Sequence, residues 1–213
     1  MIVELSGVEV NVRQWGPNAG SSRGTLALHG FTGSGEDFAS IATSLGGQFA
    51  AVDFVGHGGS DSPEGIEPYS MKFAVGVVFE VVRALGWDSV DVIGYSMGGR
   101  VAVSLFAQSP VWLNSLTVVG AHAGIADEVE RRQRIEQDNR LADRILKIGV
   151  DNFSDEWEQV PVLLSQGNIY APVLKGLRSR RRENEALGLA NSLRGMGAGA
   201  MTPVWGDLGQ CES

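Results

Sequence analysis

The stretch GYSMGGR, residues 94–100, decides the fold class of this 213-residue chain. It follows the apolar run 90–93 and precedes a segment whose composition is typical of a helix. A Gly-x-Ser-x-Gly pattern between a buried strand and a helix forms a sharp turn that exposes the serine hydroxyl at the carboxyl end of a sheet. Gly94 and Gly98 provide the room for this turn, and Ser96 is the candidate nucleophile.

Short apolar runs and a helical segment surround this turn. Between residues 70 and 85 the apolar residues recur every three or four positions, which predicts a helix with one face in the core. Strands that alternate with helices at this spacing favour right-handed crossovers and a parallel sheet. The predicted strands are residues 2–9, 10–15, 25–28, 49–52, 90–93 and 116–119.

The distribution of charge divides the chain into three predicted parts. Residues 1–125 form the core, whereas residues 126–185 are rich in charged residues and lack a strand-like run, which indicates a helical cap over the sheet. Residues 186–213 are expected to return to the core and to leave it incomplete. We therefore predict an α/β fold with a mostly parallel sheet flanked by helices, a helical cap insertion and missing C-terminal strands.

The composition argues against several classes of function. The chain has 17 basic and 25 acidic residues, a net charge of −8, which disfavours contact with nucleic acid phosphates. No apolar run approaches the roughly 20 residues of a membrane span, and the N-terminus lacks a signal-peptide pattern. The single cysteine, Cys211, forms no internal disulfide, which fits a reducing cytoplasm. We expect a cytoplasmic protein that binds a small molecule.

Two backbone groups are candidates for an oxyanion hole beside Ser96. The helix that begins at Met97 directs its free N–H groups and the positive end of its dipole at the serine. The second donor in such a site comes from the loop after an earlier strand, and HGFTG at residues 29–33 occupies that position. The backbone N–H groups of Phe31 and Met97 are therefore the predicted oxyanion donors.

HGFTG, DFVGHG at residues 53–58 and the serine turn occur in an order and spacing that resemble the α/β-hydrolase superfamily. More narrowly, the chain resembles the family of 2-succinyl-6-hydroxy-2,4-cyclohexadiene-1-carboxylate (SHCHC) synthases of menaquinone biosynthesis. General esterases share the serine turn but not GLANSLRGMG. The narrower match is carried by residues 29–34, 94–100, 130–134, 157–162 and 188–197.

This resemblance implies a lyase that uses no cofactor and no metal. A base removes a proton from a cyclohexene substrate and pyruvate leaves, with Ser96 acting as the base or its relay. The resemblance also implies that Arg132 and Arg178 hold substrate carboxylates and that Trp157 lines the pocket. Planar guanidinium groups bind carboxylates through two parallel hydrogen bonds, although arginines in a charged helix more often form a solvated face.

Three further residues are candidates for the substrate pocket. His29 begins HGFTG, residues 29–33, which we call the HG loop. A histidine at this place more often braces the backbone than takes part in chemistry. Tyr95 precedes the candidate nucleophile. His122 follows the run 116–119, which should lie beside the run 90–93, so its side chain is expected at the same crevice.

The base that would accept the Ser96 proton is not evident in the sequence. Such a base is normally a histidine oriented by a carboxylate. In the superfamily both follow strands that come after the cap, and we find no such strands before the chain ends. His122, with Asp127 or Glu128, is an alternative, whereas Asp207 would precede the acid-bearing strand and is not assigned.

Missing strands would leave the run 116–119 as a bare sheet edge with unpaired backbone groups and an uncovered apolar face. We therefore expect marginal stability, or association of copies through this edge. Two other functions stay open. One is a serine hydrolase of ester or carbon–carbon bonds, and the other is a non-catalytic remnant that keeps the pocket without the proton relay.

Overall fold

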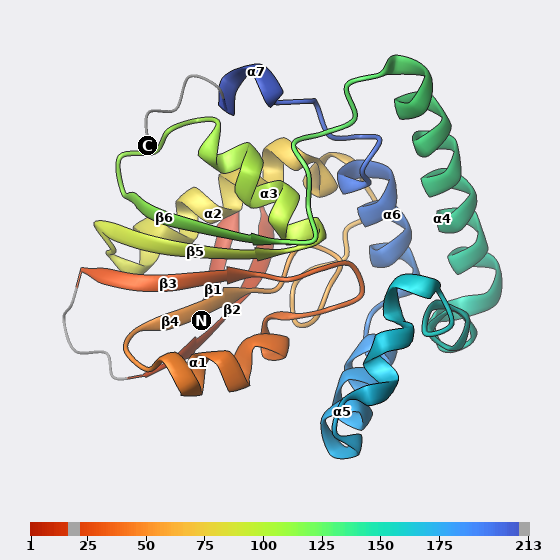
Figure 1. The fold of residues 1–213 in the computed structure, drawn as a ribbon, viewed down its shortest axis with the longest axis horizontal. Helices are drawn as coiled ribbons and strands as arrows, with labels where there is room; N and C mark the ends of the chain where they lie inside the picture. The colour runs from red at the N-terminus through yellow and green to blue at the C-terminus, as the bar shows by residue number, and fades with distance from the viewer. Residues whose placement is uncertain (17–21, 209–213) are drawn as a thin grey trace.

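Six strands form one sheet in the order β1-β2-β4-β3-β5-β6, with helices around it (Figure 1). The computed structural model describes residues 1–16 and 22–208. The strands are β1 (Ile2–Leu5), β2 (Val8–Trp15), β3 (Arg23–Leu28), β4 (Phe49–Val52), β5 (Ser89–Tyr95) and β6 (Leu113–Val119). The α-helices are α1 (Ala39–Leu45), α2 (Met71–Leu85), α3 (Met97–Phe106), α4 (Glu128–Trp157), α5 (Ala171–Arg182), α6 (Ala186–Met196) and α7 (Trp205–Leu208). The 3-10 helices are η1 (Gly35–Phe38), η2 (Glu67–Tyr69) and η3 (Pro161–Asn168).

The central strands of the sheet are parallel, as the alternation of strand and helix predicts. β3 pairs with β4 and with β5, and β5 pairs with β6, all in parallel. The N-terminal strands differ, because β2 pairs antiparallel with both β1 and β4. The α/β class is thus confirmed, and the N-terminal hairpin makes the whole sheet mixed.

The predicted boundary between the first two strands was wrong. The sequence suggested a break between residues 9 and 10, whereas the chain turns at Ser6 and Gly7, with Leu5 opposite Val8. Both turn residues have positive φ angles, 52° and 79°. Two central residues with positive φ are the requirement of the tight hairpin turn that matches the twist of the strands. The dipeptide Ser6-Gly7 therefore indicated the position of the turn better than the break expected between residues 9 and 10.

Helices α2 and α3 cover one face of the sheet, and α1 covers the other (Figure 1). Val78 of α2 packs in the same buried cluster as Val92 of β5. Ala42 of α1 packs with Phe49 of β4. Apolar residues on successive positions of the central strands thus point to opposite covered faces, which is typical of a parallel sheet between helical layers.

Residues 126–185 contain helices and loops, and the longest helix, α4, is interrupted at Gly149, where φ is 78°. α4 packs against α6 through a second buried cluster that includes Ile145 and Leu189. These helices and α5 stand at the carboxyl ends of the parallel strands (Figure 1). The helical character expected for this segment is therefore observed, and the division into core and cap stays a prediction.

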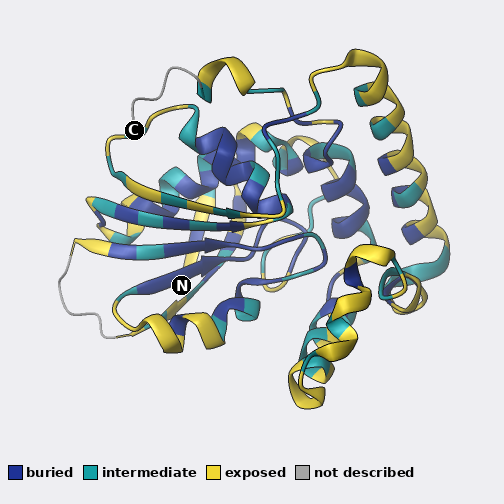
Figure 2. Cartoon of the chain, viewed as in Figure 1, coloured by how far each residue is buried: buried dark blue, intermediate teal, exposed yellow. Residues whose placement is uncertain are grey.

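Strand β6 is the last strand at its side of the sheet within the described residues. Ser115, Thr117 and Val119 on this strand are exposed. Figure 2 shows the strand coloured mainly as exposed or intermediate. Asp91 of the neighbouring strand accepts hydrogen bonds from the Ser115 hydroxyl, 2.5 Å, and the Asn114 amide, 2.6 Å. The edge is bare as expected, but its open face is more polar than the sequence suggested.

No helix in the described part of the chain is long and apolar enough to cross a membrane. Cys211, on which the cytoplasmic expectation depends, lies outside the described residues.

Candidate active site

Ser96 stands on the sharp turn between β5 and α3 that the glycine pattern predicts. Its φ and ψ angles are 52° and −109°, a conformation that residues with a side chain rarely adopt. Two hydrogen bonds hold the turn: the Ser96 N–H donates to the Val119 carbonyl, 2.8 Å, and the Gly98 N–H donates to the His29 carbonyl, 2.9 Å. Such strain persists only where the surroundings determine it, and it is frequent at functional sites.

The HG loop lies directly against Ser96. A Cβ atom placed on Gly30 would be 2.8 Å from Cδ1 of Tyr95 and 3.3 Å from the Ser96 Cβ, so a larger residue would require the Tyr95 ring to move. Within the residues that the structure describes, the backbone N–H groups of Phe31 and Met97 have no hydrogen-bond partner. These are the two groups that the sequence proposes as oxyanion donors; Phe31 lines the cavity beside Ser96, whereas Met97 is buried and not part of its wall.

His29 braces the HG loop through both ring nitrogens. Its Nε2 accepts from the Phe54 N–H, 3.0 Å, so the proton of the neutral ring is on Nδ1, which donates to the Gly30 carbonyl, 2.8 Å. Burial lowers the pKa of His29, which keeps the ring neutral. With both nitrogens occupied, His29 positions the loop and has no free site for a proton from Ser96.

His57 lies beneath the same loop, with its ring centroid 5.0 Å from that of His29 and 6.1 Å from that of Phe31. Burial, together with the neighbouring His29, lowers the pKa of His57 to about 3. Its Nε2 is buried without a hydrogen-bond partner. A ring with this pKa is neutral at pH 7 and is a poor proton acceptor.

His122 presents the wrong nitrogen for the alternative base role. Its Nδ1 accepts from the Gly124 N–H, 3.0 Å, so in the neutral ring the proton is on Nε2, which then acts as a donor. Burial lowers the pKa of His122, and the nearby Arg100 lowers it further. His122 is also not among the residues that line the cavity beside Ser96, so it does not occupy the crevice position expected from the sequence.

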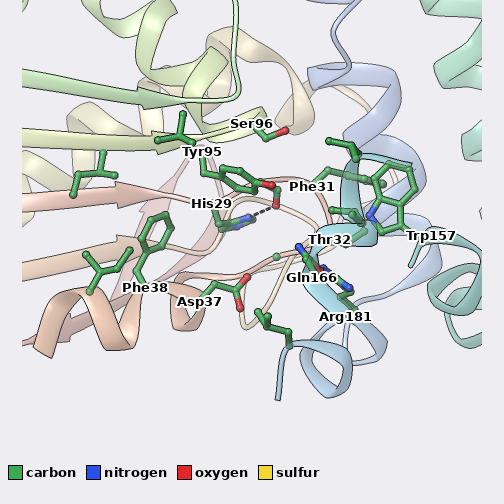
Figure 3. Close-up of a pocket in the computed structure, with 18 residues that line it drawn as sticks. His29, Phe31, Thr32, Asp37, Phe38, Tyr95, Ser96, Trp157, Gln166 and Arg181 are labelled. Atoms are coloured by element: carbon green, nitrogen blue, oxygen red, sulfur yellow. Dashed lines mark hydrogen bonds between the residues drawn. The ribbon is translucent and has the colours of Figure 1, made fainter. Parts of the chain in front are cut away.

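A cavity of about 380 Å³ opens beside Ser96 (Figure 3). Aromatic rings form much of its wall. Among them, Phe31 packs edge-on against Trp157, with ring centroids 5.4 Å apart. Gln166 and Arg181 contribute polar groups from η3 and α5. The cavity is lined by His29, Gly30, Phe31, Thr32, Gly33, Asp37, Phe38, Ile41, Ile93, Tyr95, Ser96, Val119, Trp157, Val162, Leu163, Gln166, Leu177 and Arg181.

The structure brings five of the nine sequence-predicted site residues to this cavity, whereas Met97, His122, Arg132 and Arg178 are outside its wall. The residues at the cavity wall are His29, Phe31, Tyr95, Ser96 and Trp157. Arg132 lies elsewhere on α4, with its side chain 72% exposed and paired with Glu128. Arg178 is also outside the wall, and its Nε is 2.8 Å from Glu158 Oε2. Their carboxylate-binding roles stay predictions.

Two other arginines lie near the site without having been singled out from the sequence. Arg181 lines the cavity and is only 7% exposed. Arg100, the last residue of GYSMGGR, donates a hydrogen bond of 2.7 Å to the Met196 carbonyl. Burial, with the nearby charge of Arg134, lowers the pKa of Arg100 to about 10. The sequence RSRRR, residues 178–182, indicated a group of cations that includes Arg181, but it does not show which of these arginines is buried.

A family model described as alpha/beta hydrolase fold matches residues 26–166. A Bacillus subtilis protein provisionally named 2-succinyl-6-hydroxy-2,4-cyclohexadiene-1-carboxylate synthase is 37% identical over 205 residues, which cover 96% of this chain and 74% of that protein. An Enterobacter protein with the same enzyme name is 31% identical over 72% of this chain, and the match spans 58% of its length.

Solved structures share the same fold. The structure of MenH from S. aureus superposes with a TM-score of 0.84 at 23% identity, covering 92% of this chain and 74% of that chain. A thermophilic esterase from Thermogutta terrifontis superposes with a TM-score of 0.78 at 20% identity, covering 94% of this chain and 73% of that chain. The chain belongs to the α/β-hydrolase fold family, and within it to the relatives of the 2-succinyl-6-hydroxy-2,4-cyclohexadiene-1-carboxylate synthases.

Proposed function

We propose that this protein is a lyase of the SHCHC synthase type, which eliminates pyruvate from a carboxylate-bearing cyclohexene substrate. The observation that carries the proposal is the 37% identity over 96% of the chain to the Bacillus subtilis protein of that name. The site supports it, because Ser96 opens onto a cavity large enough for a small ring compound.

The reaction needs a base and a group that stabilises negative charge. Removal of a ring proton leaves an electron pair that forms a new ring double bond, while the ring C–O bond breaks and its electrons leave on oxygen as the enolate of pyruvate. This enolate takes up a proton to give pyruvate, which balances the proton removed from the ring. In the proposal, the N–H groups of Phe31 and Met97 stabilise the enolate-like oxygen that develops during proton removal. Ser96 is the group next to the reacting carbon, and acts as the base or as its relay.

No histidine in the described part of the chain donates to or accepts from the Ser96 hydroxyl. His29 and His57 serve the loops beneath the site, and His122 presents a donor. Turnover therefore depends on how strongly the Ser96 oxygen itself can act as a base.

A pyruvate-release assay with the immediate precursor of SHCHC tests the proposal. We expect turnover by the purified chain, and a loss of roughly 10²- to 10⁴-fold in Ser96→Ala. Ser44→Ala, on the exposed surface of α1, is the matched control and should keep full activity. Folded protein that releases no pyruvate would contradict the proposal for this chain.

A serine hydrolase of ester or carbon–carbon bonds is the second candidate, because Ser96 stands on a strand-to-helix turn of the kind that exposes a nucleophile. Labelling with a fluorophosphonate probe separates the candidates, since the probe needs an activated serine hydroxyl. Labelling of Ser96 together with hydrolysis of 4-nitrophenyl acetate, and no pyruvate release, would favour the hydrolase. A folded chain that is inert in every assay would be a binding remnant.

We also propose that copies of the chain associate along the edge of β6. The supporting observation is that this strand has no neighbour on its outer side within the described residues. Sedimentation should show self-association that increases with concentration. Thr117→Lys places a charge on the exposed edge strand and should shift the protein toward monomer. Thr43→Lys on α1 should not, and a wild-type monomer at all concentrations would refute the proposal.

A further inference from the structure

Arg181 is an unusual group at the cavity wall. It lies on α5, at the opposite side of the cavity from Ser96 (Figure 3). Its side chain is 9% exposed, and a guanidinium carries five N–H donors. One hydrogen bond engages it, from Nη2 to Gln166 Oε1 at 2.6 Å. Nη1 has no hydrogen-bond partner among the described residues, so most of the donor capacity of this buried cation is unused.

The carboxylates around Arg181 are engaged by other arginines. Asp37 Oδ1 accepts from Arg180, whose Nε is 2.9 Å away. Glu158 Oε2 is 2.8 Å from Arg178 Nε, and its Oε1 is 3.9 Å from Arg181 Nη1, beyond hydrogen-bond distance. Glu158 Oε1 is itself buried without a hydrogen-bond partner, so it compensates the charge of Arg181 as an ion pair but accepts none of its N–H groups. The N–H groups of Nη1 thus stay available to a further acceptor such as a ligand carboxylate.

The position of Arg181 is built into the fold rather than set by a mobile side chain. Asn184, just after α5, donates to the Thr32 carbonyl at 3.0 Å and accepts from the Gly58 N–H at 3.1 Å. The pair of Arg180 and Asp37 ties α5 to η1. These contacts join α5 to the HG loop and to the Gly-His-Gly turn, so Arg181 is held at a set place relative to Ser96.

The remainder of the wall is mainly apolar and aromatic. Phe31, Tyr95 and Trp157 provide rings, and Phe38, Leu163 and Leu177 provide apolar surface. A highly charged ligand such as a phosphate ester would find one cation and much apolar surface. A molecule with an apolar ring and a carboxylate matches both parts of the wall.

We propose that Arg181, rather than Arg132 or Arg178, is the residue that binds a carboxylate in this cavity, and that the ligand is a small ring compound with the carboxylate remote from the atom that reacts at Ser96. The inference rests on the proposed function, in that the carboxylate would be one of those on the lyase substrate. It is tested by binding, which does not depend on turnover.

Isothermal titration calorimetry with 3-phenylpropionate and its uncharged amide tests this assignment. Both probes carry the same ring, and only the acid can pair with Arg181. We expect the wild-type chain to bind the acid at least about tenfold more tightly than the amide. In Arg181→Gln the affinity for the acid should fall roughly 10- to 100-fold, to that of the amide, since a hydrogen-bonded charge is lost. The affinity for the amide should not change.

Two variants provide the controls. Arg181→Lys keeps the charge but loses the planar fork, so its affinity for the acid should lie between those of the wild type and Arg181→Gln. Arg140→Gln removes an arginine on α4 that is 69% exposed and pairs with Glu136, and should bind the acid as the wild type does. Unchanged amide binding shows that the cavity has kept its shape in each variant.

Equal affinity of the wild type for acid and amide would overturn the assignment, as would an acid preference that survives in Arg181→Gln. Should Arg181→Gln fail to fold, the wild-type comparison and Arg181→Lys still decide it. The result is separable from the lyase proposal. Preference for the acid without pyruvate release contradicts the lyase alone, whereas pyruvate release without this preference contradicts the role of Arg181 alone.

Discussion

Gly98→Ala is expected to destabilise the protein by about 3 kcal/mol or more and to abolish pyruvate release. A Cβ atom at this position would lie 2.2 Å from the Leu28 carbonyl oxygen and 2.6 Å from the His29 carbonyl oxygen. Both obstacles are backbone atoms at the end of β3, so no side-chain rotation relieves the clash. The start of α3 must move away, and the turn that holds Ser96 must move with it.

A thermal melt measured by circular dichroism checks the stability, with a fall in Tm of at least about 6 °C for a chain of this size. Gly65→Ala is the matched control, because a Cβ there meets no atom within 4 Å and the φ angle is not positive. It should change the stability by less than about 0.5 kcal/mol. A Gly98→Ala variant with wild-type Tm and full pyruvate release would show that the turn is not built as described.

Asp53→Asn is expected to cost about 2–5 kcal/mol of folding free energy. The Asp53 side chain is completely buried, and its oxygens accept from the Gly35 N–H at 2.6 Å, the Gly59 N–H at 2.9 Å and the Asn11 amide at 2.8 Å. These bonds join β2 to the segments that follow HGFTG and GHG. An asparagine at this position would turn an NH₂ group toward N–H donors, which leaves buried groups unpaired.

The same carboxylate gives a defined pH dependence. Burial by itself raises the pKa of Asp53, but hydrogen bonds from Gly59, Asn11 and Gly35 outweigh it, so the pKa lies below its ordinary value. The folded state thus binds the proton less readily than the unfolded state. The contribution of Asp53 is fully present above the unfolded pKa, and it is lost as the pH falls below about 4 and through the folded pKa.

Urea unfolding between neutral pH and about pH 3 measures this contribution. The difference in unfolding free energy between the wild type and Asp53→Asn should be largest near neutral pH and should shrink as the wild-type carboxylate becomes protonated. Asp151→Asn, with a side chain that is 83% exposed, is the control and should follow the wild type. A difference that stays constant over this pH range would contradict the assigned role of the charge.

Local sequence signals predicted those parts of the site whose geometry depends on neighbouring residues. Gly94 and Gly98 flank Ser96 at a spacing that only one strand-to-helix turn satisfies, so the turn and its strained serine followed from seven residues. HGFTG likewise predicted the loop beside it. The Ser6-Gly7 turn was equally local and could have been recognised, because the dipeptide suits a tight hairpin.

The residues of the cap could not be assigned in the same way. Arg132, Arg178 and Arg181 all occur in charged helical segments, and the resemblance to a family favoured the first two. Which of the two on α5, Arg178 or Arg181, faces the cavity depends on the rotation of α5 against the HG loop, set by Asn184 and by the pair of Arg180 and Asp37. A helix that is charged on most of its surface gives little amphipathic signal to indicate its buried face.

The sequence by itself thus determined the α/β class, the parallel central sheet, the serine turn and the loop that faces it, since each depends on steric demands within a short segment. Only the tertiary structure decided that the histidines near the site have their nitrogens occupied or buried, and that Arg181 rather than Arg132 or Arg178 reaches the cavity. Those outcomes depend on burial and on hydrogen bonds between residues far apart in the chain, which no local pattern encodes.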